Sequence, residues 1–146
     1  AVECIFHFPS RSAFLAEAAK VLTRDGRLAL SDFVPPLEWL PELQRRDPGQ
    51  DELTRLSYGQ VELLCPLEHY RLHAEQAELT LRTSEDVTEQ IMPTYTFLRA
   101  DQRGWQDRQT ARCHERATAR LETACRLGYL RYTILSFGRA AVAQAA

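Results

Sequence analysis

The sequence predicts an α/β domain, because its first 34 residues read as a strand, a helix and a second strand. Residues 2–6 are apolar with β-branched and aromatic members, and residues 27–34 are apolar on both faces of a strand. Between them, apolar residues recur at helical spacing. A right-handed crossover makes two such strands parallel, so their carboxyl ends share the edge where open α/β sheets bind ligands.

The helix of this unit has clear start and stop signals. Ser10 is a good N-cap after Pro9, and Asp25-Gly26 ends the helix soon after Thr23. Its apolar face is made by Phe14, Leu15, Ala18, Val21 and Leu22.

The middle of the chain changes in composition. Residues 35–58 are interrupted by prolines but still carry apolar side chains, which predicts a lid-like insertion with a short helix. Pro66 then opens a helix that runs to about Ala77, and residues 78–82 alternate as a half-exposed strand does.

The last third is predicted to be helical and then to close with a strand. Thr83 and Asp86 have the spacing of a capping box for a helix that contains Pro93. A long helix follows from about Trp105 to Leu127. Residues 129–137 are rich in β-branched and aromatic side chains, which favours a final strand.

The composition is that of an ordinary folded domain. The 146 residues suffice for one domain, and 45% apolar and 26% charged residues are near the average of globular proteins. A net charge of -2 argues against nucleic acid as a partner, and no apolar run approaches the roughly 20 residues that span a membrane. No membrane partner is therefore predicted.

The cysteines and the single methionine bear on location and completeness. The four cysteines are scattered without a C-x-x-C pair, so we expect reduced, mostly buried thiols. The start, AVECIFHF, has no basic region or cleavage site of a signal peptide, so a cytoplasmic protein is predicted. Met92 is the only methionine, which favours a piece of a longer polypeptide.

Three blocks carry a resemblance to a known family: residues 3–11 (ECIFHFPSR), 20–22 (KVL) and 26–33 (GRLALSDF). Together they resemble class I S-adenosylmethionine-dependent methyltransferases, in the branch that acts on quinones, amines and natural products. In that family they correspond to the fourth strand, the next helix and the fifth strand. Residues 70–98, with DVT at 86–88 and PTY at 93–95, resemble the family's substrate-side half.

The resemblance implies a Rossmann-like class I methyltransferase fold that is incomplete at its N-terminus. It would have parallel strands, an antiparallel C-terminal strand, and substrate-side helical insertions at 35–58 and 84–127 within the single domain 1–146. The family's Gly-rich loop and ribose-binding carboxylate are absent, since the six glycines are isolated and no G-x-G occurs.

The implied activity is methyl transfer from the cofactor S-adenosylmethionine to an oxygen or nitrogen of a small metabolite. An upstream segment or a partner chain is expected to complete the sheet. The alternative is a non-catalytic remnant or subunit that is stable only against such a partner, because unpaired strand edges recruit other chains.

Two residues are candidates for the chemistry. His7 follows the first predicted strand, where an imidazole can accept a proton from an attacking hydroxyl or amine. Asp32, near the end of the second strand, could orient His7 or bind the acceptor. The alternatives are a packed histidine at a strand-helix junction and an aspartate that caps backbone amides.

Further candidates would contact the cofactor and the acceptor. The resemblance places Val2, Glu3 and Cys4 beside the cofactor. Aromatic side chains could stack on a flat acceptor or enclose a cationic amine, although simple hydrophobic cover is the more common role in lids. The candidates for binding the acceptor are Phe33, Trp39, Tyr58 and Tyr95.

Two other patterns are read as solvated helix faces. His69 and His73 have i, i+4 spacing, but a third ligand is missing, so no metal site is predicted. A stripe of arginines at four-residue spacing along residues 108–120 is interspersed with acidic residues, which favours ion pairing over an acidic partner.

Overall fold

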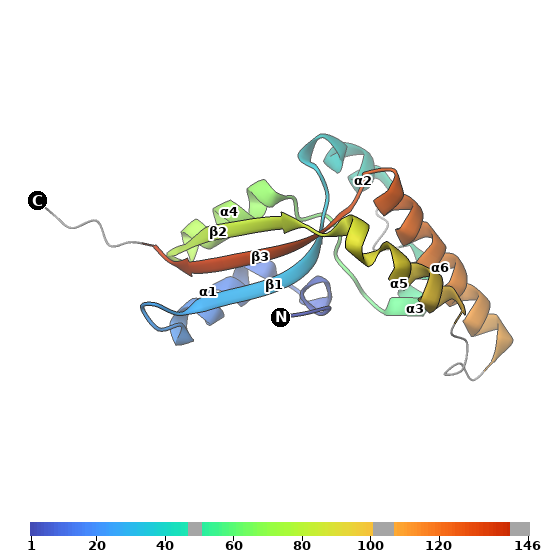
Figure 1. Cartoon of the computed structure of the whole chain (residues 1–146), viewed down its shortest axis with the longest axis horizontal. Helices are drawn as coiled ribbons and strands as arrows, with labels where there is room; N and C mark the ends of the chain where they lie inside the picture. The colour runs from blue at the N-terminus through green and yellow to red at the C-terminus, as the bar shows by residue number, and fades with distance from the viewer. Residues whose placement is uncertain (47–50, 101–106, 141–146) are drawn as a thin grey trace, which may run out of the picture.

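The computed structural model describes residues 1–46, 51–100 and 107–140, and its centre is a three-stranded sheet (Figure 1). The strands are β1 (Arg27–Val34), β2 (Leu79–Asp86) and β3 (Arg131–Arg139), in the order β1-β3-β2. β3 is antiparallel to both neighbours, so β1 and β2 run in the same direction. The predicted antiparallel C-terminal strand is therefore confirmed.

The prediction of a strand over residues 2–6 is wrong. Glu3 adopts a positive φ of 55°, which turns the chain out of the extended conformation, and Ile5–His7 form the 3-10 helix η1. Ala1 bonds to the backbone of β1. Its N–H donates to the Ala29 carbonyl at 2.8 Å and its carbonyl accepts from Ser31 N–H at 3.0 Å, which is the pattern of a parallel bridge to β1.

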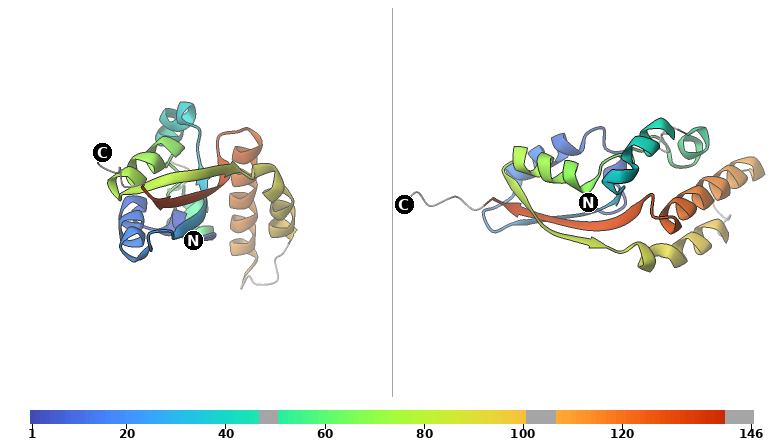
Figure 2. Two further views of the ribbon diagram at one scale, coloured as in Figure 1. Left: turned by 60° about the vertical axis from the view of Figure 1, so that its left-hand side comes forward. Right: turned by 90° about the horizontal axis from the view of Figure 1, so that it is seen from above.

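Helices α1 (Arg11–Val21) and α4 (Leu67–Gln76) lie side by side over one face of the sheet (Figures 1 and 2). The side chain of Ser10 accepts from Ala13 N–H at 3.1 Å, which confirms the predicted cap of α1. The buried residues at this interface include Leu15, Leu30, Tyr70, Ala74, Leu79, Leu135 and Phe137.

The insertion after β1 holds the 3-10 helix η2 (Leu37–Trp39) and two short helices, α2 (Leu40–Arg46) and α3 (Glu52–Tyr58), where one was predicted. β2 extends to Asp86, so the predicted capping box is wrong. Thr83 Oγ1 instead lies 2.6 Å from Ser136 Oγ on β3, and Asp86 accepts from Thr88 N–H at the start of α5 (Thr88–Ala100).

Helix α6 (Arg108–Arg126) packs against both α3 and α5, and these three helices extend beyond the end of the sheet where β1 and β2 terminate (Figure 1). The predicted start of α6 at Trp105 lies outside the described residues. No helix in the described part of the chain is long and apolar enough to cross a membrane.

Candidate functional site

A cavity of about 280 Å³ lies at the carboxyl end of β1. Phe33 from β1 and Tyr132 from β3, which face each other in the sheet register, form one wall. Residues of η1, the 59–64 segment, α3, α5 and α6 close the remainder. The cavity therefore occupies the sheet edge at which α/β proteins bind ligands.

Aromatic rings make up a large part of the lining. The ring centroids of Phe33 and Tyr132 are 5.1 Å apart in an edge-to-face arrangement, and Phe6 lies 5.6 Å from Phe33. Tyr58 and Tyr95 line the cavity from α3 and α5. The predicted acceptor-binding residues Phe33, Tyr58 and Tyr95 are thus brought together by the fold.

The tyrosine hydroxyls of the cavity are already hydrogen-bonded within the protein. The hydroxyl of Tyr58 pairs with Thr118 Oγ1, and that of Tyr95 lies 3.5 Å from Cys125 Sγ. Burial raises the pKa of both phenols, so both remain protonated at neutral pH. These residues consequently offer ring faces to a ligand.

Glu3 reaches the cavity through its unusual backbone conformation. The hydroxyl of Tyr132 donates to the Glu3 carboxylate and lies 2.8 Å from Ser31 Oγ. The Glu3 N–H also donates to Ser31 Oγ at 3.3 Å. Burial and the bond to Glu3 raise the pKa of Tyr132, so the phenol keeps its proton at neutral pH.

His7 also lines the cavity, and its ring is oriented by a backbone carbonyl. Nδ1 lies 3.1 Å from the carbonyl oxygen of Gln60. Because a carbonyl only accepts, the neutral imidazole carries its proton on Nδ1 and leaves Nε2 as a proton acceptor. With the neutral ring in this tautomer, the cavity presents Nε2 of His7 as an acceptor beside the Glu3 side chain.

Asp32 is placed on the other face of the sheet from Phe33, as expected for successive residues of a strand. It is completely buried, and it accepts from Arg11 Nε at 2.7 Å and from the Tyr70 hydroxyl at 2.6 Å. Phe33 N–H donates to its second oxygen at 2.8 Å. The fold therefore does not bring Asp32 to His7, whose ring has Gln60 as its partner.

The buried Arg11 links this face to the cavity wall. Burial lowers the pKa of Arg11, but the ion pair with Asp32 outweighs burial and raises it, so the guanidinium stays charged. Burial raises the pKa of Asp32, and the bonds from Arg11 and Tyr70 oppose that change. Arg11 also pairs with the Glu62 carboxylate and donates to the Glu62 carbonyl at 2.6 Å.

Glu62 lies in the segment that supplies Gln60, Val61 and Leu63 to the site. Its N–H donates to the Phe6 carbonyl at 2.8 Å, which ties the segment to η1. The Arg11 network thus holds the backbone that orients His7. The conformation of this segment depends on contacts with α1 and η1, both distant in sequence.

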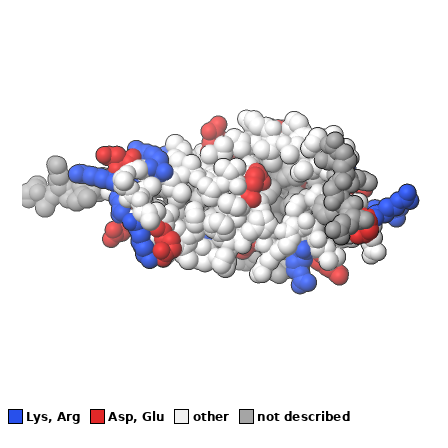
Figure 3. Space-filling model, turned by 90° about the horizontal axis from the view of Figure 1, so that it is seen from below, with Lys and Arg blue, Asp and Glu red and all other residues white. Residues whose placement is uncertain are grey.

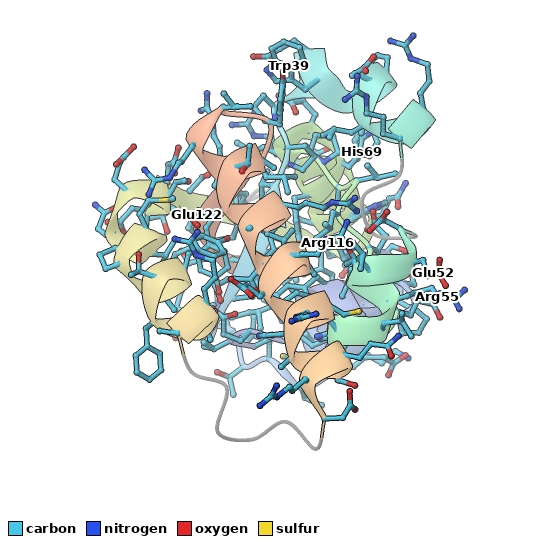
Figure 4. All side chains as sticks on the ribbon, turned by 90° about the vertical axis from the view of Figure 1, so that its right-hand side faces the viewer. Trp39, Glu52, Arg55, His69, Arg116 and Glu122 are labelled. Carbon is cyan, nitrogen blue, oxygen red and sulfur yellow. The ribbon has the colours of Figure 1, made fainter. Side chains whose placement is uncertain are left out.

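The remaining predicted residues lie outside the cavity lining. Val2 is 75% exposed and Cys4 is partly exposed. Trp39 packs edge-to-face on Tyr129, with ring centroids 4.7 Å apart, and lies well away from Glu52 and Arg55 of α3 (Figure 4). Trp39 therefore packs just beyond the C-terminal end of α6 and does not line the cavity.

Sequence reasoning missed several lining residues. Tyr132 lies within an apolar strand, where it resembles core, and Phe6 lies within a segment mistaken for a strand. A polar hydroxyl within the apolar run 129–137 was the available signal for Tyr132. No local pattern marks Gln60, which acts through its backbone carbonyl.

Known proteins support the same assignment of fold. No protein-family profile matches the sequence. A curated relative, the 27-O-demethylrifamycin SV methyltransferase of Amycolatopsis mediterranei (strain S699), is 30% identical over 96 residues, which cover 66% of this chain and 34% of the relative. This chain therefore matches only about a third of that protein's length.

Solved structures resemble nearly the whole chain. A Galdieria sulphuraria protein assigned as a sarcosine dimethylglycine methyltransferase has a TM-score of 0.71 at 16% identity, over 95% of this chain and 51% of that protein. The geranyl diphosphate C-methyltransferase of Streptomyces coelicolor A3(2), solved with Mg²⁺, geranyl diphosphate and S-adenosyl-L-homocysteine, has a TM-score of 0.63 at 11% identity. That match covers 95% of this chain and 46% of the enzyme.

Proposed function

From the Rossmann-like class I S-adenosylmethionine-dependent methyltransferase fold of this chain, we propose that it forms the acceptor-binding part of an enzyme that methylates an oxygen or nitrogen of a small metabolite. The chain spans about half the length of the solved structures that it resembles. The substrate, the cofactor and a cytoplasmic location are parts of this proposal.

The observation that carries the proposal is the cavity where Glu3 and His7 meet the aromatic lining. It lies at the carboxyl end of β1, where ligands bind in this class of sheet. Helices α3, α5 and α6, which wall it, belong to the proposed substrate-side insertions at 35–58 and 84–127.

Methyl transfer requires alignment of the acceptor and exclusion of water more than it requires a strong base. S-adenosylmethionine would supply the activated methyl group when bound. The aromatic and aliphatic side chains would hold the acceptor and keep water away. Nε2 of His7 would take the proton that the attacking hydroxyl or amine loses, while Nδ1 stays bonded to Gln60.

Residues 2–4 fit a position beside the cofactor. Val2 is an apolar side chain left largely exposed, next to the point where Ala1 joins the edge of β1. The Glu3 carboxylate and the partly exposed Cys4 follow it. We propose that Val2, Glu3 and Cys4 contact the methionine or adenosine side of S-adenosylmethionine, with the Gly-rich part of its site on another segment.

Isothermal titration with S-adenosyl-L-homocysteine tests this proposal. The chain is titrated alone and again when extended by the sequence encoded upstream of Ala1. We expect weak or no binding by the chain alone and micromolar binding by the extended chain. Failure of both would remove the support for a methyltransferase.

A second candidate function is that of a non-catalytic subunit, and the unpaired edge of β1 favours it. Within the described residues, β1 pairs only with β3 and, through two hydrogen bonds, with Ala1. The face on the β1 side has few charged side chains across its middle (Figure 3). Absence of S-adenosyl-L-homocysteine binding together with a stable complex with another chain would support this function.

A further inference from the structure

We infer that the cavity selects an uncharged, ring-containing acceptor and rejects anionic ones. The inference rests on the proposed function only in calling the ligand a methyl acceptor. The selectivity itself follows from the lining, and it can be measured without cofactor or turnover.

The walls of the cavity are mostly apolar. Its aliphatic side chains come from three separate parts of the chain, the 59–64 segment, α5 and α6, and they face the aromatic wall of the sheet. They are Val61, Leu63, Ile91, Leu98 and Leu121. A flat apolar molecule would bury its surface against both sides, and such burial is the main driving force for ligands of this kind.

Few polar groups are left to solvate a charged ligand. The hydroxyls of Tyr58 and Tyr95 are bonded to α6, and that of Tyr132 is bonded to Glu3 and Ser31. Glu3, His7, Thr54 and Thr94 are the other polar members of the wall. A charged group in the cavity would thus lose its water without gaining equivalent hydrogen bonds, which is costly.

The charge of the lining disfavours anions in particular. None of the described lining residues is Lys or Arg, and Glu3 contributes a carboxylate. The neighbouring guanidiniums have partners elsewhere, since Arg11 pairs with Asp32 and Arg99 with Glu122 on α6, on the side that faces α5 (Figure 4). A ligand carboxylate would therefore meet a like charge with no cation to offset it.

A neutral hydroxyl suits the polar end of the same cavity. A hydroxyl can donate to the Glu3 carboxylate or to Nε2 of His7, both of which accept. The Tyr132 hydroxyl already satisfies part of the Glu3 charge, which reduces both its attraction for a cation and its repulsion of an anion. The cavity thus fits a phenol-like acceptor better than an ammonium or a carboxylate.

Three ligands on one scaffold test the inference: 1-naphthol, 1-naphthoate and 1-naphthylmethylammonium. Each is titrated into the chain at pH 7 and followed by naphthalene fluorescence. We expect 1-naphthol to bind tightest and 1-naphthoate at least about tenfold more weakly, a difference of about 1.4 kcal/mol. Equal or tighter binding of either charged ligand, or no binding of 1-naphthol, would overturn the inference.

Variants test whether naphthol binds in this cavity and whether the Glu3 carboxylate causes the weaker binding of naphthoate. Thr94→Trp places a large ring at the cavity wall and should abolish naphthol binding, whereas Thr96→Trp, also exposed on α5 but outside the lining, should not. Glu3→Gln should improve naphthoate binding severalfold. An unchanged thermal unfolding curve for both tryptophan variants excludes misfolding as the cause.

The two proposals fail separately. Selective naphthol binding without S-adenosyl-L-homocysteine binding would leave the inferred cavity and remove methyl transfer. S-adenosyl-L-homocysteine binding with unselective binding of the three naphthalene ligands would keep methyl transfer and remove the inferred selectivity.

Discussion

Arg11 and Asp32 form an ion pair that is almost wholly shielded from solvent, with side chains 3% and 0% exposed. Removing one partner of a buried pair leaves an uncompensated charge, at a cost of about 3–5 kcal/mol. Arg11→Met should therefore lower the free energy of unfolding by that amount, measured by urea denaturation. The expected loss includes the bonds that Arg11 makes to Glu62.

Lys20→Met on the same helix is the matched control. Lys20 pairs with Glu17, and both side chains are about two-thirds exposed. Exposed pairs contribute about 0–1 kcal/mol, so this change should be nearly neutral. A similar loss in both variants would argue against a special role for the buried pair.

His7 is the residue to which the proposed chemistry assigns proton transfer. His7→Gln removes the unprotonated Nε2, and kcat of the extended chain should fall by about 10²-fold if proton removal contributes to the rate. His69→Gln, on α4 and away from the cavity lining, serves as the control. An unchanged kcat in His7→Gln would leave only alignment and water exclusion as sources of catalysis.

The four free thiols should differ in reactivity. Burial raises the pKa of Cys65 to about 12, and burial also raises that of Cys125, so neither forms much thiolate at pH 8. Cys4 and Cys113 are partly exposed. Iodoacetamide should label these two first, as read by peptide mass spectrometry, and early labelling of Cys65 would contradict the described packing.

Part of the site could be predicted at this scale. Position after a predicted strand pointed to His7, aromatic character pointed to Phe33, Tyr58 and Tyr95, and the family resemblance pointed to Glu3; all five line the cavity, while their roles stay predictions. The sequence could not show on which face of the sheet the Asp32 side chain lies, because that depends on which face α4 covers. Its burial against Tyr70 is set by a residue 38 positions away.

Two helix ends provide a paired prediction at the scale of elements. α6 is followed by Gly128 with φ of 75°, whereas α4 is followed by Glu78 with φ of 57°. A left-handed conformation costs a residue with a Cβ about 1–2 kcal/mol. Gly128→Ala should therefore lower the free energy of unfolding by that amount. No further steric cost is expected, because no atom lies within 4 Å of the added methyl group.

Glu78→Gly should have the opposite or no effect. Glycine relieves the strain at this position, while its freedom in the unfolded chain offsets part of the gain. Thermal unfolding of both variants measures the contrast. A clear loss of stability in Glu78→Gly would indicate that the Glu78 side chain makes a contribution larger than its strain.

Local signals predicted helices better than strands. Ser10 and the apolar spacing identified α1, and the long periodic segment identified α6. β2 was predicted too short because residues 82–86 are exposed at the sheet edge and carry no apolar alternation. η1 was mistaken for a strand because a short, continuously apolar run shows neither the two-residue period of a strand nor the period of a helix.

At the scale of the whole molecule, the order β1-β3-β2 places the last strand between the two earlier ones. Local sequence patterns do not specify that order, since it depends on how the helices between strands pack. The family resemblance supplied the antiparallel last strand, and the comparisons support the same fold. The cavity arises from this order, because Tyr132 reaches Phe33 only when β3 adjoins β1.

The most direct test of the account is transfer of a radiolabelled methyl group from S-adenosylmethionine to 1-naphthol by the extended chain. We expect labelled product with the natural sequence and with Thr96→Trp, and little or none with Thr94→Trp. Equal transfer by Thr94→Trp would contradict the claim that this cavity holds the methyl acceptor.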